Sequence, residues 1–126
     1  MTIGEFSNIT EINAYTLRYY EKKELLYVNR DAIGRRDYRE EDVEWVKFIK
    51  RLKDTGMLLR DIKHYSALRY QGDDTMRKRM ELLIRHRETV LEEQKRWAEY
   101  LNNLDEKIEI YRKGIGKLGG SYDIRD

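Results

Sequence analysis

The chain has 126 residues, of which 40% are charged and 40% hydrophobic, and its formal net charge is +2. This length suits one small domain and an appendage, and so much charge without any proline is typical of a helical protein with long solvated faces. Because the sequence contains no cysteine, disulfides, thiolate metal sites and cysteine redox switches are excluded. His64 and His86 lack ligand-like spacing, so no metal and no other cofactor is expected.

Targeting signals are not found in the sequence. No apolar run approaches the length that spans a bilayer, and no basic segment followed by an apolar stretch marks a secretory signal. We therefore expect a cytoplasmic protein without a membrane partner. The net charge decides little about nucleic-acid binding, because local basic patches suffice. Arg35, Arg36 and Arg39 form one such patch, and Lys22 and Lys23 form another.

Two short helices separated by a tight turn are predicted near the start of the chain. Thr2 and Glu5 match a capping box in front of a helix over residues 3–8. A turn over residues 9–12 leads to Asn13, a good N-cap for a second helix that runs to about residue 23. Two short helices joined in this way form a helix-turn-helix arrangement.

The second helix has two different faces. At about 100° per residue, Leu17 lies among the residues that face the core. The opposite face and its flanks are aromatic, hydroxylic and cationic, a mixture that can contact phosphates and base edges in a major groove. The candidate nucleic-acid contacts here are Asn13, Tyr15, Thr16, Arg18, Tyr19 and Lys22. The alternative is that they are ordinary surface residues of an amphipathic helix.

A β-hairpin is predicted next. Its strands cover residues 25–28 and 36–38 and flank a turn-prone stretch over residues 29–34. Gly34 takes the position that needs unusual backbone angles. Arg35 and Arg36 make the hairpin positively charged, which serves either phosphate binding or plain solubility.

Two further helices are predicted over residues 40–54 and from about residue 59 to residue 70. Acidic residues crowd the first turn of the earlier helix, where the helix dipole favours them, and Gly56 follows its end. Apolar residues recur at helical spacing and should face the core: Val43, Val46, Ile49, Leu52, Ile62 and Tyr65.

A long helix is predicted over residues 75–112, after a linker over residues 71–74 and before a disordered tail over residues 113–126. Its apolar residues alternate spacings of four and three over five heptads, which end near Arg112 and are typical of a coiled coil. The seam positions assigned to dimerisation are Met80, Leu83, Val90, Trp97, Leu101, Leu104 and Ile108, and Met76, Arg87, Gln94 and Tyr111 complete the repeat. Folding back onto the N-terminal domain is the competing interpretation.

Three strings resemble the DNA-reading helix and first wing of the MerR family of bacterial transcription regulators, at that family's spacing. They are TLRYYEKKELL over residues 16–26, GRRDY over residues 34–38 and the REEDV that follows it over residues 39–43. The resemblance implies a mainly α fold, with a winged helix-turn-helix domain over residues 1–70 and then an antiparallel coiled coil that forms a homodimer. The third and fourth helices would be its second wing.

The resemblance also assigns roles on DNA. It implies that Arg36 and Tyr38 hold the phosphate backbone. Arg35, which stands in a position that is usually aromatic in the family, and Arg60, at the start of the fourth helix, are further candidates for DNA contact. The dimer would bind a palindromic promoter operator and distort it, so that transcription by RNA polymerase changes.

Within the family, residues 40–56, 72–75 and 104–111 look closest to a small branch that responds to aldehyde and thiol stress. Members of that branch often carry a sensor cysteine in the third helix. Here Arg51 or a neighbour stands in that place, so sensing through a thiol is excluded. Any effector would be a reversibly bound small molecule, and the aromatic residues that either line its site or simply pack are Trp45, Tyr65, Tyr70, Trp97 and Tyr100.

Catalysis is not expected, because the sequence shows no nucleophile–base pair, phosphate-cradling glycine loop or metal site. Two alternatives to a switching regulator stay open. One is a constitutive architectural DNA-binding protein without an effector, and the other is a structural coiled-coil adaptor.

Overall fold

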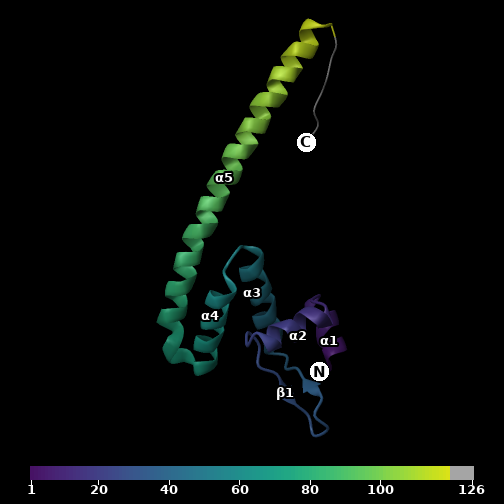
Figure 1. The fold of residues 1–126 in the computed structure, drawn as a ribbon, viewed down its shortest axis with the longest axis vertical. Helices are drawn as coiled ribbons and strands as arrows, with labels where there is room; N and C mark the ends of the chain where they lie inside the picture. The colour runs from purple at the N-terminus through teal and green to yellow at the C-terminus, as the bar shows by residue number, and fades with distance from the viewer. Residues whose placement is uncertain (120–126) are drawn as a thin grey trace. The chain divides into compact units, whose positions relative to one another are not determined.

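The computed structural model describes residues 1–119, and this range contains five α-helices, a short 3₁₀ helix and one antiparallel β-hairpin (Figure 1). It divides into two units, the first comprising Met1–His86 and the second beginning at Arg87. The elements are α1 Ile3–Thr10, α2 Ala14–Lys22, β1 Asn29–Arg30, β2 Arg36–Asp37, α3 Asp42–Asp54, α4 Leu59–Gln71, η1 Asp73–Thr75 and α5 Met76–Lys117.

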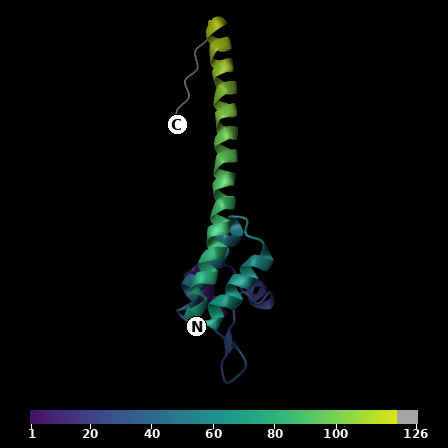
Figure 2. The same cartoon turned by 90° about the vertical axis from the view of Figure 1, so that its left-hand side faces the viewer.

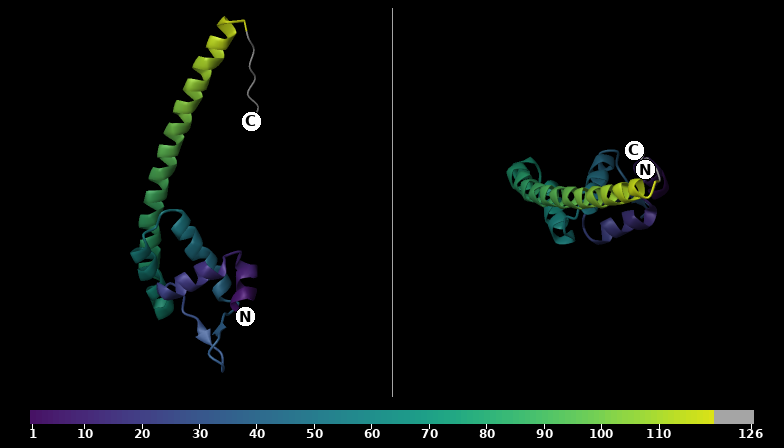
Figure 3. Two further views of the ribbon diagram at one scale, coloured as in Figure 1. Left: turned by 45° about the vertical axis from the view of Figure 1, so that its right-hand side comes forward. Right: turned by 90° about the horizontal axis from the view of Figure 1, so that it is seen from above.

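The first two helices begin as their caps predict. The Glu5 backbone N–H donates to Thr2 Oγ1 at 3.1 Å and the Thr2 N–H donates to Glu5 Oε1 at 3.3 Å, which completes a capping box. Asn13 Oδ1 accepts from the Thr16 N–H at 2.8 Å and caps α2. The two helices pack against each other, and α1 also packs against α3 (Figure 3). The helix-turn-helix predicted from these caps is therefore present.

Helices α2 and α3 end in the same way. After α2, the Leu25 N–H donates to the Tyr20 carbonyl at 2.9 Å, while Glu24 adopts a left-handed conformation with φ 61°. After α3, the Met57 N–H donates to the Leu52 carbonyl at 3.0 Å, and Gly56 has φ 89°. Both ends are Schellman motifs, which satisfy carbonyl groups that a helix end would otherwise leave unpaired.

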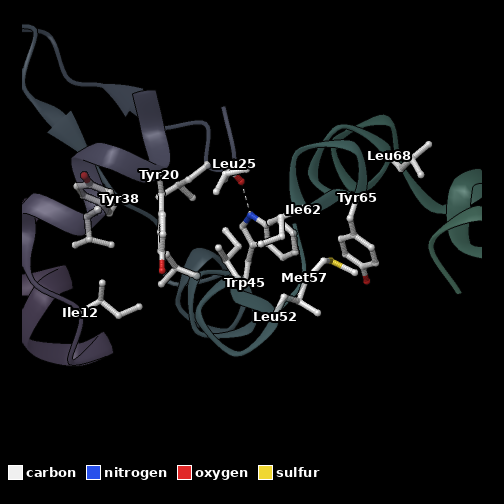
Figure 4. Packing of buried hydrophobic residues seen from close by; sticks show 14 of the residues in the cluster. Ile12, Tyr20, Leu25, Tyr38, Trp45, Leu52, Met57, Ile62, Tyr65 and Leu68 are labelled. Atoms are coloured by element: carbon white, nitrogen blue, oxygen red, sulfur yellow. Dashed lines mark hydrogen bonds between the residues drawn. The ribbon is translucent and has the colours of Figure 1, made fainter. Parts of the chain in front are cut away.

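The core of the first unit lies between α1, α2, α3 and α4 (Figure 4). The carbonyl of Leu25, just after α2, accepts two buried hydrogen bonds, from Trp45 Nε1 at 3.1 Å and from Ser66 Oγ at 2.7 Å. Trp45 lies on α3 and Ser66 on α4. The Leu25 carbonyl oxygen therefore links the end of α2, the predicted DNA-reading helix, to α3 and α4, the predicted second wing.

The hairpin strands are shorter than predicted, and the first begins later, at Asn29 rather than at residue 25. Leu25 and Leu26 are both 0% exposed and belong to the core, so they do not pair with the second strand. Pairing begins only where the chain leaves the core, with Asn29 opposite Asp37 and Arg30 opposite Arg36.

Helix α5 is longer than predicted and runs without interruption to Lys117 (Figure 2). The expected tail over residues 113–126 is therefore wrong for residues 113–117, and residues 120–126 lie outside the described range. Gly114 and Gly116 weaken a helix by about 1 kcal/mol each relative to alanine but do not break it as proline would. Within residues 1–119, no helix is both long and apolar enough to cross a membrane.

Candidate nucleic-acid interface

The outer face of α2 is a stripe of three exposed residues. Tyr15, which is 78% exposed, is followed at helical spacing by Arg18 and Lys22, both exposed. On the opposite side Leu17 is 0% exposed, as the angular analysis predicts. The stripe offers an aromatic ring, a guanidinium and an ammonium, the groups that reach base edges and phosphates in a major groove.

The other candidates on α2 are less free. The Asn13 side chain caps α2 by accepting a hydrogen bond from the Thr16 N–H. The Thr16 side chain is half-buried. Tyr19, predicted on the outward face, is half-buried and packs against the core. Its ring lies under two ammonium groups, Lys53 Nζ at 4.8 Å and Lys23 Nζ at 5.8 Å from its centroid. Lys53 comes from α3, so the second wing adds a cation beside the DNA-reading helix that sequence reasoning missed.

The loop of the hairpin is organised by Asp31. Its Oδ1 accepts from the backbone N–H groups of Ile33 and Arg35, each at 2.9 Å, and its Oδ2 accepts from Arg35 Nε at 3.2 Å. These hydrogen bonds, that from the Arg35 N–H above all, hold the pKa of Asp31 below its usual value. Gly34 has φ 85°, as predicted for this position. Arg35 remains 72% exposed and can reach a phosphate.

Tyr38, which the resemblance assigns to phosphate contact, is buried in this structure. It is 1% exposed and stacks on Phe6, with 4.5 Å between ring centroids, and within residues 1–119 its buried hydroxyl has no hydrogen-bond partner. Burial raises the pKa of this hydroxyl. Alternate residues of a strand share a face, so Arg36 points to the same inner side as Tyr38 and is itself half-buried. The phosphate contact that the resemblance implies for Tyr38 stays a prediction.

Arg36 is held by a carboxylate of α2. Its Nε donates to Glu21 Oε2 at 2.5 Å, and this hydrogen bond raises the pKa of the Arg36 guanidinium. Arg30 Nη2 donates to the other oxygen of the same carboxylate, Glu21 Oε1, at 2.9 Å. The structure thus joins the hairpin to the DNA-reading helix through Glu21, a residue that the sequence analysis did not single out. The role of Glu21 can be recognised only once the strand register is known, because that register places Arg30 opposite Arg36.

Arg60 stands apart from this cluster. It lies in the first turn of α4 with 82% of its side chain exposed, and its recorded ionic neighbour is Asp61 at 3.9 Å. Among residues 1–119, no ion pair joins it to the hairpin or to α2. It remains a separate candidate for phosphate contact.

The aromatic residues suggested as an effector site pack against their neighbours. Trp45 and Tyr65 are buried and stacked, with ring centroids 5.7 Å apart. Tyr70 packs on Tyr27 at 4.2 Å, and its hydroxyl accepts from the Tyr27 N–H at 3.1 Å. In the first unit these rings pack against neighbouring rings, and Trp45 and Tyr65 also line an open surface pocket beside Arg69.

The seam residues of α5 differ in exposure. Leu83 is partly buried and packs against the core of the first unit, so it does not face solvent as a free seam position. In the second unit the seam is largely open: Trp97 is 67%, Leu101 59%, Leu104 60% and Ile108 39% exposed, and Val90 is intermediate. Met80, which precedes them in the first unit, is 54% exposed.

Two family models match the chain. The model for MerR HTH family regulatory proteins matches residues 1–68, and the model described as MerR, DNA binding matches residues 43–109. An uncharacterized HTH-type transcriptional regulator of Haemophilus influenzae is 38% identical over 103 residues, which cover 81% of this chain and 76% of that protein. The HTH-type transcriptional regulator AdhR of Bacillus subtilis is 36% identical over 93 residues, 73% of this chain and 66% of AdhR.

Solved structures agree with these matches. HiNmlR, described as a MerR family regulator lacking the sensor domain and bound to promoter DNA, superposes with a TM-score of 0.78 and 35% identity over 94% of both chains. A putative MerR family transcriptional regulator from Listeria monocytogenes gives a TM-score of 0.83 and 31% identity over 88% of this chain and 85% of that one. The resemblance drawn from the sequence is thereby confirmed, and with it the expectation that the chain is not an enzyme. On this combined evidence, the chain belongs to the MerR family of helix-turn-helix transcription regulators.

Proposed function

We propose that the protein binds promoter DNA as a homodimer, with α2 in the major groove and the hairpin along the phosphate backbone, and so regulates transcription in the cytoplasm. The observation that carries this proposal is the exposed stripe of Tyr15, Arg18 and Lys22 on a helix tied to two arginines of the hairpin. The similarity to HiNmlR, whose structure contains promoter DNA, supports it.

The proposal of a homodimer rests on α5. Four consecutive seam residues of the second unit expose between 39% and 67% of their surface, and their heptad spacing is that of a coiled coil. A second copy of the chain offers the same stripe, so the two can bury each other's apolar side chains. Two DNA-reading helices would then meet two halves of a palindromic operator.

The effect on RNA polymerase would come from distortion of the DNA. Bending a site of 20–30 base pairs costs on the order of 1–6 kcal/mol, which many phosphate contacts must offset. Arg35, Arg60 and Lys53 are exposed cations that can contribute such contacts. Fluorescence energy transfer between dyes at the two ends of a bound duplex would measure the bend, and run-off transcription with RNA polymerase would measure its consequence.

Binding itself is tested with a duplex that the wild-type protein selects from a random library, compared with a scrambled duplex of the same composition. Arg18→Ala should weaken binding to the selected duplex by about tenfold or more, because one good base contact is worth roughly 1–3 kcal/mol. Arg77→Ala, which removes an exposed arginine from the start of α5, is the matched control and should leave the affinity unchanged. A wild-type protein that enriches no sequence overturns the proposed function.

A further inference from the structure

Two arginines of the hairpin share one carboxylate. Arg30 and Arg36 are direct partners in the pairing of β1 with β2, so their like charges lie opposite each other, an arrangement that destabilises a strand pair. Glu21, near the end of α2, accepts a hydrogen bond from each of them, one on each oxygen. The carboxylate therefore both neutralises the pair and fixes the hairpin to the helix that carries the exposed stripe.

The ion pair of Glu21 with Arg36 is less exposed to water than the other ion pair of the hairpin, that of Arg35 with Asp31. The Glu21 side chain is 21% exposed, that of Arg36 31% and that of Arg30 45%, whereas Arg35, paired with Asp31 within the loop, is 72% exposed. Charge-assisted hydrogen bonds gain strength as water is excluded, so Glu21 restrains its arginines more firmly than an exposed partner would.

We propose that Glu21 is a specificity-determining residue. It holds Arg30 and Arg36 in one orientation, in which they bind DNA phosphates only when α2 lies in the major groove of the DNA sequence that the protein recognises. The inference rests on the proposed DNA binding. Each guanidinium has five N–H donors and uses one on Glu21, so donors remain for a phosphate, but only along the directions that Glu21 leaves open. On unrelated DNA, where α2 is not seated, a phosphate must instead compete with the carboxylate.

Removing the charge should therefore release the arginines toward any DNA. In Glu21→Gln, affinity for a scrambled duplex should rise by about fivefold or more, and the slope of log affinity against log salt should steepen by about 0.9 for each arginine that gains a phosphate. The selected duplex should gain less, so the ratio of specific to nonspecific affinity should fall, by about fivefold if the selected duplex gains nothing. Glu21→Asp keeps the charge and should recover most of this ratio.

Glu24→Gln is the matched control. It removes the same charge three residues away, but Glu24 pairs with Lys63 at 2.9 Å and not with the hairpin. Its specificity ratio should stay that of the wild type. An equal rise in nonspecific affinity in both variants would show a plain effect of net charge and overturn the proposal.

Two further outcomes separate this inference from its alternatives. If Glu21→Gln loses affinity equally on both duplexes and melts at a lower temperature, the residue has only a structural role and the proposal is wrong. If the wild-type protein itself shows no preference for the selected duplex, the proposed function fails, and the inference fails with it.

Discussion

Glu24 and Gly56 occupy equivalent positions at the ends of α2 and α3, yet only one of them suits its backbone. Both have left-handed φ values, 61° for Glu24 and 89° for Gly56. A residue with a Cβ is strained in this region, whereas glycine is not. The ion pair of Glu24 with Lys63 compensates little, because both side chains are more than half exposed.

Glu24→Gly should therefore stabilise the protein by about 0.5–1 kcal/mol, because it relieves the strain without disturbing a buried contact. Gly56→Ala should destabilise the protein by about 1 kcal/mol, because it places a Cβ on a residue with a left-handed backbone. A Cβ at Gly56 would meet no atom within 4 Å, so backbone strain alone is measured there. Urea unfolding at one fixed protein concentration checks both, and a loss of stability in Glu24→Gly would contradict the argument.

Tyr38→Phe distinguishes the structural position of Tyr38 from the role that the resemblance implies. The ring is buried on Phe6, and its hydroxyl has no hydrogen-bond partner among residues 1–119. Loss of a buried unpaired hydroxyl should leave stability unchanged or raise it by up to about 1 kcal/mol. Affinity for the selected duplex should stay within about twofold, because the hydroxyl is not presented to DNA. A tenfold loss without unfolding would show that Tyr38 turns outward to a phosphate.

The sequence predicts single residues well where the rule is local. The Thr2–Glu5 capping box, the Asn13 cap and the left-handed Gly34 and Gly56 all appear as expected. Tyr38 and Glu21 were not predictable in this way, because their positions depend on the register of the hairpin and on the packing of that hairpin against α1 and α2.

At the level of elements, the helices agree with the sequence pattern more closely than the strands do. Helical periodicity placed α3 and α4 to within two residues at each end. The first strand was placed too early because Leu25 and Leu26 are apolar, as strand residues often are, but they fill the core after α2. Only the tertiary fold shows that the Leu25 carbonyl bonds to α3 and α4 instead of to a neighbouring strand.

Helix α3 also brings Lys53 to the surface of α2, which yields a prediction for the second wing. Lys53→Met keeps an aliphatic side chain but removes the ammonium that lies over the Tyr19 ring. If Lys53 contacts a phosphate, the salt slope of binding should flatten by about 0.9 per protomer on both selected and scrambled DNA. Lys50→Met, which removes an ammonium that Asp54 pairs at 2.8 Å, should change the slope less. Equal salt slopes for the wild type and Lys53→Met would show that Lys53 does not contact a DNA phosphate.

For the molecule as a whole, the sequence anticipated the long helix but ended it too early. The sequence predicts a disordered tail from residue 113, yet α5 continues through Gly114 and Gly116 to Lys117. The heptad continues with it, since Ile115 follows Tyr111 at the expected spacing of four and is only partly exposed. The seam available to a partner therefore extends beyond residue 112.

Exposure alone does not identify the dimer interface, because Leu104 and Ile110 are nearly equally exposed, at 60% and 61%. Leu104 belongs to the heptad seam, whereas Ile110 lies two residues after the seam residue Ile108, on the outer side of a coiled coil. This pair offers a matched test of the proposed homodimer, with the same apolar type replaced by the same charge at similar exposure.

Leu104→Glu should convert a micromolar dimer into monomers, because association would bury a carboxylate from each chain in an apolar seam. Operator affinity should then fall by about a hundredfold, since each DNA-reading domain loses the benefit of its linked copy. Ile110→Glu should remain dimeric and bind as the wild type does. Sedimentation equilibrium and fluorescence anisotropy measure the two properties, and circular dichroism verifies that both variants keep their helix. If both variants dissociate, or if neither does, the register assigned to the seam is wrong even if the protein is a dimer.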